Sequence, residues 1–367
     1  MKRAYVIVDN LKIGGYQRLS LDQAYALADL KFAVSIVALS PKDLWDAAKI
    51  EYSELKQKNI ELVESASGRF ELLRFLHRFI PKNSPNVLII SHSLRATFAL
   101  RLIKILFNRK FTINTTLHQL PRLSHFSQRV KRFIYSQFTD NLFCFSRAAE
   151  LDWYSQFGET LKAPLHRFSK RIKVMRNGIY LDRLPINHQT SQPTSAPRII
   201  FLGRLSFWKG LNTIKMMANS EELRDFDFVL MVPAITPDDL HELNNLLGPR
   251  LCLIQGKSVA SLASQKGDVH IYPANYGSEV KFIESISLNC LEMCAMGIPS
   301  VVTFGGLVTW PELSQFQLVH EVDWSNIKEI ESAIRLSQRL ELNPIERAEV
   351  RKIIDIHRQI ESYLKTN

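Results

Sequence analysis

Two series of alternating strand-like and helix-like segments constrain the fold of this chain more than any other feature of its sequence. In the first series, helical patterns alternate with short apolar runs that are typical of buried strands, at residues 3–9, 33–39, 87–93, 111–118 and 141–146. In the second series, the corresponding apolar runs lie at residues 198–203, 227–232, 251–256, 268–274 and 299–305. Strands that alternate with helices form parallel sheets covered by helices on both faces. The sequence therefore predicts an α/β protein with two doubly wound, Rossmann-like domains.

A polar segment at residues 188–197, HQTSQPTSAP, separates the two series. It contains two prolines and no periodic pattern, as expected of a linker between domains. Ligands of open α/β sheets bind outside the carboxyl ends of the strands, so we expect the two domains to present their loops to a central cleft. The last segment, residues 343–367, is polar and amphipathic and is predicted to form one long helix.

The composition is that of a globular protein outside the membrane. The chain has 367 residues, which fits two domains, and its apolar content of 46% is ordinary. No window approaches the ~18 unbroken apolar residues that cross a bilayer. The apolar run near the N-terminus ends at Asp9, which is too early for a signal peptide. We therefore expect a cytoplasmic location.

The cysteines form no metal-binding pattern. Cys144, Cys252, Cys290 and Cys294 include no CxxC pair and show no Cys/His spacing of a zinc site. Cys290 and Cys294 lie one helical turn apart, which favours two buried thiols on one face of a helix. The sequence leads us to expect no metal and no cofactor.

The positive charge is concentrated in one part of the chain. The formal net charge is +11, and residues 95–176 hold 16 Lys/Arg against 4 Asp/Glu. A basic half beside a nearly neutral half indicates an anionic partner, which is nucleic acid, a phosphorylated substrate or an anionic membrane. The alternative is a solvated basic surface without a partner.

A membrane and a nucleic acid would each use the segment 126–138 in a different way. Its cations cluster beside apolar residues, so it is predicted to be a basic amphipathic helix at a membrane interface; an apolar face packed in the core is the alternative. A nucleic-acid-binding protein would use Phe126, Phe133 and Tyr135 as stacking surfaces. These aromatics recur at helical spacing, which favours core packing instead, so nucleic acid is not the partner that we expect.

The loop in FLGRLSFWKGL, residues 201–211, is suited to a diphosphate. A strand ends at Gly203, and two cations, Arg204 and Lys209, follow before a helix begins. An Arg side chain gives bidentate hydrogen bonds to phosphate, and a Lys side chain gives a mobile point charge. Solvated loop cations are the alternative.

A second segment, residues 279–306, carries two glutamates eight positions apart. Gly297 and Pro299 mark the end of a helix predicted over 288–296, so Glu284 lies in the loop before the helix and Glu292 within it. The N-terminus of a helix favours phosphate. Because the helix is otherwise apolar, Glu292 is expected to be partly buried with hydrogen-bonding partners, such as the hydroxyls of a ribose.

Together these motifs resemble the donor-nucleotide domain of retaining glycosyltransferases with the GT-B fold, specifically glycosyltransferase family 4. The resemblance rests on GRLSFWKG, the E-x7-E spacing and MGIPSVVTFGG. In the first half, VDNLKIGGYQR resembles the first glycine loop of the family and TTLHQ resembles its strand that ends in His. FSRAAELDWYSQFG and IKVMRNGIYLDRL resemble later family segments. The resemblance spans most of the chain.

The resemblance implies a domain organisation and a reaction. It implies an acceptor-binding domain over 1–187, a linker at 188–197, a nucleotide-sugar domain over 198–345 and a C-terminal helix over 346–367 that returns to the first domain. The donor would be a UDP- or GDP-type sugar, and the acceptor a glycan or a lipid-linked molecule in bacterial surface polysaccharide or glycoconjugate synthesis. The enzyme would be metal-independent and cytoplasmic, either free or peripheral on the inner membrane face.

The resemblance also assigns roles to particular residues. The diphosphate would lie on Arg204 and Lys209, the ribose on Glu292, and the hydroxyls of the transferred sugar on Glu284. His118 would lie at the transferring carbon. The backbone N–H groups of Ser287 and Leu288 would meet sugar or phosphate, and Gly14 and Gly15 would let the first loop approach the donor or acceptor. No acceptor-binding residue is assigned.

One departure from the family pattern keeps alternatives open. Ser285 and Ser287 stand where many members have glycine, and serine tolerates fewer backbone conformations. A catalytically inactive relative that only binds a sugar nucleotide or a partner is therefore an alternative, as is Glu284 acting as a covalent nucleophile. A nicotinamide-dependent oxidoreductase is disfavoured because no G-x-G-x-x-G follows a strand.

Overall fold

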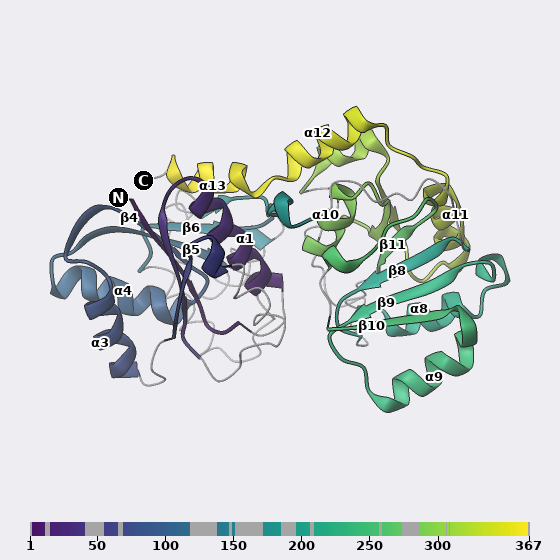
Figure 1. Ribbon diagram of the computed structural model, residues 1–367, viewed down its shortest axis with the longest axis horizontal. Helices are drawn as coiled ribbons and strands as arrows, with labels where there is room; N and C mark the ends of the chain where they lie inside the picture. The colour runs from purple at the N-terminus through teal and green to yellow at the C-terminus, as the bar shows by residue number, and fades with distance from the viewer. Residues whose placement is uncertain are drawn as a thin grey trace, which may run out of the picture. The chain divides into compact units, whose positions relative to one another are not determined.

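The structure of the protein, a computed structural model, describes residues 2–11, 15–40, 55–64, 69–117, 138–146, 149–150, 172–184, 196–205, 209–256, 259–273, 287–305, 307 and 309–365. The chain forms two compact units (Figure 1). Unit 1 comprises residues 1–180 together with 356–367, and unit 2 comprises residues 181–355. The linker expected at 188–197 lies mostly outside the described residues.

Unit 1 is built on a seven-stranded parallel sheet with the strand order β3-β2-β1-β4-β5-β6-β7. Its strands are β1 (Arg3–Val8), β2 (Ala33–Ala38), β3 (Glu61–Glu64), β4 (Asn83–Ser91), β5 (Lys110–Leu117), β6 (Asn141–Cys144) and β7 (Ile172–Val174). Its described helices are α1 (Gly15–Asp29), α3 (Arg69–Phe79), α4 (Leu94–Leu106) and α13 (Ile356–Leu364). The apolar runs in the sequence predicted every one of these strands except β3 and β7.

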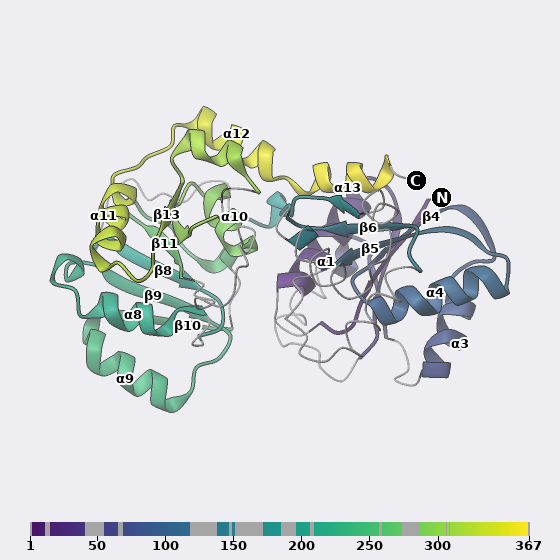
Figure 2. The ribbon, with the colours of Figure 1, turned by 180° about the vertical axis from the view of Figure 1, so that it is seen from behind.

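Helices cover both faces of the unit 1 sheet, as the sequence predicts (Figures 1 and 2). On one face, Leu76 of α3 and Leu100 of α4 pack against Ile7 and Ile89 of the central strands, and all four side chains are fully buried. On the other face lie α1 and α13. The ring of Tyr363 in α13 meets the ring of Phe143 in β6 edge-on at 4.7 Å between centroids. The C-terminal helix is therefore part of the core of unit 1.

Unit 2 is built on a six-stranded parallel sheet with the strand order β10-β9-β8-β11-β12-β13. Its strands are β8 (Arg198–Leu202), β9 (Asp227–Val232), β10 (Leu251–Gln255), β11 (Val269–Tyr272), β12 (Ser300–Thr303) and β13 (Val319–Val322). Its described α-helices are α8 (Leu211–Ala218), α9 (Pro237–Leu247), α10 (Leu288–Ala295), α11 (Ile327–Gln338) and α12 (Pro344–Ile354), and a 3-10 helix, η2 (Leu181–Arg183), begins the unit.

The core of unit 2 forms between one face of its sheet and helices α8, α9 and α11. Phe201, Phe228 and Ile271 point from the strands to Ile214 of α8 and Ile330 of α11, and each is at most 1% exposed. Helix α10 lies against β11 and β12 on the opposite face, and α12 packs on α10 (Figure 2). The predicted parallel α/β fold with helices on both faces is thus confirmed for both units.

Local sequence signals fix where several helices begin and end. Ser93 caps α4 by accepting a hydrogen bond from the backbone N–H of Ala96. Asn343 and Glu346 form a reciprocal capping box at the start of α12. Gly297, with φ of +76°, follows the last turn of α10 and ends it.

The terminal segment differs from the prediction of one helix over 343–367. It forms two helices, α12 and α13, which are interrupted at Asp355, where the backbone is extended. The N–H of Ile356 donates to the carbonyl of Ile179, so tertiary packing in unit 1 replaces the helical hydrogen bond. The described residues contain no helix that is both long and apolar enough to cross a bilayer.

Candidate functional site

The strand order of unit 2 defines where a ligand is expected to bind. From β8 the chain builds outward through β9 to β10, and it then returns to β11 on the other side of β8. Ligands of open α/β sheets bind in the crevice at the carboxyl ends of the strands at such a reversal. The residues that follow β8 and β11 therefore define the candidate site.

The loop after β8 carries the two predicted cations. Arg204 is exposed, and Lys209 is half-buried. The Nζ atom of Lys209 donates to Tyr272 Oη at 2.5 Å and lies 4.8 Å from the centre of the Tyr272 ring. Tyr272 is the last residue of β11. The lysine ammonium is thus held at the reversal point of the sheet.

A glycine sets how closely α8 approaches β11. Gly210 precedes α8 with φ of +85°, a region that favours glycine. A Cβ atom at this position would lie 2.4 Å from the carbonyl oxygen of Pro273, which follows β11. The backbone that carries Lys209 is therefore packed directly against the carboxyl end of β11.

Helix α10 begins beside the end of β8. Its N-cap is Ser287, whose side chain accepts a hydrogen bond from the N–H of Cys290 at 3.2 Å. The side-chain amide of Asn289 donates to the carbonyl of Leu202, the last residue of β8, at 2.9 Å. This contact places the positive end of the α10 dipole at the same strand end from which Arg204 follows.

Glu292 lies one turn further along α10 and is buried, with 5% of its surface exposed. Its Oε1 accepts a hydrogen bond from Arg183 Nη2 in an ion pair whose side chains are 8% and 6% exposed. The expectation of a buried carboxylate with a partner is confirmed. The partner is a cation of η2, which the sequence did not indicate.

Arg351 of α12 connects the two elements that carry this ion pair, η2 and α10. It donates to the carbonyl of Leu181 in η2 at 3.2 Å and to the carbonyl of Ala295 at the end of α10 at 3.3 Å. Burial lowers the pKa of the Arg351 guanidinium from its usual value. Two backbone carbonyls compensate part of the lost hydration, so Arg351 fixes η2 against α10.

Unit 1 has a corresponding reversal between β1 and β4. After β1, the Asp9 carboxylate accepts a hydrogen bond from Ser93 Oγ at 2.7 Å, and Asn10 Oδ1 accepts one from Gln17 Nε2 at 2.9 Å. Burial, followed by the charge of Asp9, raises the pKa of Tyr16. These polar side chains line the carboxyl edge of the unit 1 sheet.

The C-terminal helix, α13, is connected to this edge by hydrogen bonds. His92 Nε2, at the end of β4, bonds to Gln23 Oε1 at 2.7 Å. The amide of Gln23 then donates to Gln359 Oε1 at 3.2 Å, and Tyr363 Oη bonds to Thr116 Oγ1 at 2.8 Å. Burial raises the pKa of Tyr363, which keeps its hydroxyl neutral. The edge of the sheet is therefore fixed by a buried network that includes α13.

The structure brings some of the predicted residues together. Ser287, Leu288 and Glu292 lie on α10, beside the loop that carries Arg204 and Lys209. Gly15 begins α1 in unit 1, and a Cβ atom added to it would meet, within 4 Å, none of the described residues apart from its own helix and chain neighbours. The predicted residues that lie outside the described residues are His118, Glu284, Ser285 and Gly14.

Sequence reasoning missed several residues of the site, namely Arg183, Tyr272, Asn289 and Arg351. A signal existed for Arg183. A carboxylate within the apolar helix LNCLEMCA demands a cation, and NGIYLDRL supplies one just before the second domain. Tyr272 and Asn289 are packing partners that only the fold defines.

Comparison with solved structures identifies the fold. HepE (Alr3699) of Anabaena, solved with UDP and glucose, has a TM-score of 0.71 at 14% identity, with 100% of both chains covered. A glycosyltransferase of Rickettsia africae ESF-5 has a TM-score of 0.71 at 15% identity, covering 100% of this chain and 98% of that one. For sucrose-phosphate synthase of Thermosynechococcus elongatus, the TM-score is 0.67 at 14% identity, with 100% and 98% covered.

The chain therefore has the GT-B fold that these glycosyltransferases share, as the sequence predicts. No protein-family model matches the sequence, and no curated protein matches it at a significant level. At such low identities the likeness defines the fold, and the activity is argued from the site.

Proposed function

We propose that this chain is a retaining glycosyltransferase of family 4 that moves a sugar from a nucleoside-diphosphate sugar to a glycan or lipid-linked acceptor. One observation carries the proposal: a lysine, a helix N-terminus and a buried carboxylate are held together at the reversal point of the unit 2 sheet. HepE of Anabaena was solved with UDP and also with UDP-glucose, which supports a nucleotide-sugar donor for a chain of this fold.

The diphosphate is assigned to Arg204, Lys209 and the N-terminus of α10. Tyr272 is a neutral partner of Lys209, so their hydrogen bond orients the ammonium without cancelling its charge. When the bond between sugar and phosphate breaks, negative charge develops on the departing phosphate. Cations and a helix dipole that are already in place stabilise that charge without reorganisation. The scheme gives this task to protein groups rather than to a metal ion.

The ribose is assigned to Glu292. A carboxylate offers about four lone-pair positions on two oxygens, and Arg183 occupies part of this capacity. The ion pair also holds the buried Glu292 carboxylate in one orientation, so its remaining acceptor positions point in fixed directions. Arg183 is accordingly a positioning residue for the ribose-binding carboxylate.

The transferred sugar is assigned to Glu284, His118 and the loop at Gly15. These roles rest on the family resemblance for Glu284 and His118. For Gly15, the role is supported by the space beside its Cα atom, because the packing of the described residues does not require a glycine there. In the scheme, the departing phosphate accepts the proton of the acceptor hydroxyl, and the acceptor attacks from the face that the phosphate leaves. The configuration at the sugar carbon is then retained.

The acceptor is assigned to unit 1, at the polar edge formed after β1 and β4. Asp9, Asn10 and His92 provide donors and acceptors suited to sugar hydroxyls. The basic excess of residues 95–176 favours a phosphorylated or lipid-diphosphate acceptor. A cytoplasmic enzyme of bacterial polysaccharide or glycoconjugate synthesis, peripheral at the membrane, fits this assignment.

The second candidate function is a sugar-nucleotide binder without transfer activity, suggested by the serines that replace glycines. The geometry at Ser287 favours the active enzyme. Its φ of −66° and ψ of 156° are accessible to any residue, and its side chain caps α10. The serine thus has a structural role of its own, and it strains no backbone.

Mass spectrometry with a panel of nucleotide sugars tests the proposal. Incubation with the correct donor and a mixed glycan acceptor pool should release free nucleoside diphosphate and add one sugar mass to an acceptor. The anomeric configuration of the product, read by NMR, should match that of the donor. Binding of a nucleotide sugar without release would favour the inactive relative, and inversion at the anomeric carbon would contradict the retaining mechanism.

A further inference from the structure

The end of helix α4 exposes a run of large apolar side chains. Ile105, Leu106 and Phe107 are consecutive and are 60%, 65% and 48% exposed. On the other side of the same helix, Leu100 and Ile103 are fully buried against the sheet. Isolated exposed apolar residues are common, but a contiguous exposed apolar patch marks an interaction site. We call residues 105–107 the α4 patch.

The α4 patch continues onto the end of the neighbouring helix α3. The ring of Phe107 lies against the ring of His77, with 4.0 Å between centroids. The buried guanidinium of Arg109 donates to the carbonyls of His77, at 2.7 Å, and Ile80. Through these contacts, Phe107 and Arg109 join the end of α4 and the residues after it to the end of α3, and the joined segments form one surface.

Cations surround this surface. Arg78, Lys82 and Lys110 are exposed, and we call them the basic rim. Two of them act on His77: burial lowers the pKa of this histidine, and the charges of Arg109, Lys82 and Arg78 lower it further. The α4 patch therefore lies in a positive field.

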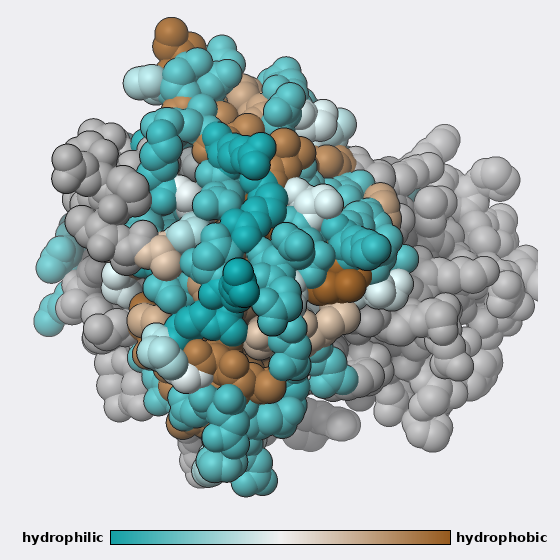
Figure 3. All heavy atoms as spheres, turned by 90° about the vertical axis from the view of Figure 1, so that its right-hand side faces the viewer, coloured by the Kyte–Doolittle hydropathy of each residue, from teal (hydrophilic) through white to brown (hydrophobic). Residues whose placement is uncertain are grey.

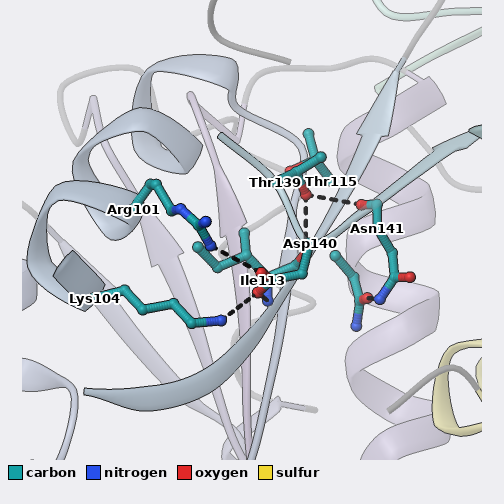
Figure 4. A network of polar contacts seen from close by, with 8 residues as sticks. Arg101, Lys104, Ile113, Thr115, Thr139, Asp140 and Asn141 are labelled. Atoms are coloured by element: carbon teal, nitrogen blue, oxygen red, sulfur yellow. Dashed lines mark hydrogen bonds and ion pairs between the residues drawn. The ribbon is translucent and has the colours of Figure 1, made fainter. Parts of the chain in front are cut away.

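Little negative charge opposes the basic rim. Among the described residues 77–82, 101–110 and 138–141, Asp140 is the only carboxylate. It is occupied by Arg101 at 3.0 Å and Lys104 at 2.7 Å, both reaching across from α4, and by the N–H of Ile113 (Figure 4). Asp140 thus neutralises cations of α4 itself, and these three described ranges hold no further carboxylate for the basic rim.

We propose that the α4 patch and the basic rim together form a docking surface for an anionic lipid bilayer. Exposed aliphatic and aromatic side chains enter the boundary between headgroups and acyl chains, while cations around them are attracted to anionic headgroups. Each feature needs the other: a nucleic acid would leave the apolar run exposed, and a second apolar protein surface would leave the cations without partners. This surface differs from the segment 126–138, which lies outside the described residues, and it is independent of the transfer chemistry proposed above.

Vesicle sedimentation of the full chain tests the apolar contribution. The protein should sediment with vesicles of equal phosphatidylglycerol and phosphatidylcholine, and not with pure phosphatidylcholine. The double variant Ile105→Ser/Leu106→Ser retains the contact between Phe107 and His77, and its partition coefficient should fall by about tenfold or more, as expected when apolar surface is lost. Circular dichroism and thermal melting verify that the variant is folded.

Unit 2 supplies the matched apolar control. Leu336 and Ile345 are 56% and 73% exposed, and their replacement by serine removes similar apolar area elsewhere. On the face drawn in Figure 3, hydrophilic side chains predominate and the hydrophobic ones form separate groups. The Leu336→Ser/Ile345→Ser variant should bind vesicles like the unmodified protein.

Charge reversal tests the electrostatic contribution. The triple variant Arg78→Glu/Lys82→Glu/Lys110→Glu should lose binding to anionic vesicles, and binding of the unmodified protein should fall as salt shortens the Debye length. The control Arg224→Glu/Lys328→Glu/Lys352→Glu changes the net charge equally on exposed positions of unit 2 and should retain most binding.

Three outcomes would overturn the proposal. They are unchanged vesicle binding by the Ile105→Ser/Leu106→Ser variant, equal losses in the two charge-reversed variants, and a dimer in light scattering that this apolar variant converts to a monomer. The last outcome would assign the surface to a second copy of the chain. Nucleotide binding by the vesicle-defective variants should be unchanged, which separates a failure of this proposal from a failure of the proposed function.

Discussion

Arg183 and Glu292 form a buried ion pair that joins η2, the first element of unit 2, to the middle of α10. The two residues are 109 positions apart in the chain. Their pairing fixes the orientation of the one carboxylate that lies among the apolar residues of α10. The candidate ribose site is therefore built jointly by the segment that enters unit 2 and by the helix that faces its ligand.

The first prediction concerns the stability of unit 2. Arg183→Met should lower the free energy of unfolding by about 3–5 kcal/mol, because it leaves the Glu292 charge buried without its partner. The double variant Arg183→Met/Glu292→Leu should recover most of this loss, since no unpaired charge remains. Urea unfolding measures both. An Arg183→Met protein that unfolds at the same urea concentration as the unmodified chain would show that the pair is not structural.

The second prediction separates the two glutamates of the E-x7-E spacing. Glu292→Gln should weaken binding of free nucleoside diphosphate by about tenfold or more, because the hydrogen bonds of an ionised acceptor are lost. Glu284→Gln should leave that binding unchanged and reduce transfer, since Glu284 is assigned to the sugar. Calorimetry and turnover assays measure the two effects. Equal losses of nucleotide binding would mean that the two sides of the diphosphate are misassigned.

The third prediction contrasts two glycines near helix starts. Gly210→Ala should lower stability by more than about 1 kcal/mol, because its φ is positive and a Cβ atom would collide with the carbonyl of Pro273. Gly15→Ala should fold normally, since the described residues leave space for a Cβ atom there, but it should impair transfer. Thermal melting and turnover measure these effects. Normal turnover of Gly15→Ala would remove the first loop from the site.

The fourth prediction concerns the thiols. Cys252 is exposed, while Cys144, Cys290 and Cys294 are buried. A thiol reagent should therefore modify one cysteine per native chain and all four after denaturation. Cys252→Ser should abolish labelling of the native protein. Rapid labelling of Cys290 or Cys294 in the native chain would show that α10 is not packed as described.

The sequence predicted most of the fold, because parallel strands that are buried on both faces leave continuous apolar runs. The three strands that the apolar runs did not predict, β3, β7 and β13, are edge strands. Their sequences, ELVE, IKV and VHEV, are short and contain charged or polar residues, because an edge strand is only partly covered. The break between α12 and α13 escaped prediction because tertiary packing, and no proline or glycine, ends the helix at Asp355.

The candidate site was predictable from the sequence where a charged residue interrupts a short apolar segment or follows it directly. Arg204, Lys209 and Glu292 stand out against their neighbours as charges at a strand end or in an apolar helix. Their partners come from distant segments, as Tyr272 does for Lys209, and no local pattern reports such a pairing. Sequence therefore indicated the charged groups, and the fold was needed to show what holds them.

Calorimetric titration of UDP and GDP is the sharpest test of the proposed diphosphate site. One of the two nucleotides should bind the unmodified chain at one site, and Lys209→Ala should weaken this binding by about tenfold or more, because a charged contact to the diphosphate is lost. Lys215→Ala is the matched control, since Lys215 lies on α8, the helix that follows Lys209, and pairs with Glu242 at the surface, so this variant should bind normally. Absence of binding to either nucleotide, or equal affinities of the Lys209→Ala and unmodified proteins, would contradict a diphosphate site at Lys209.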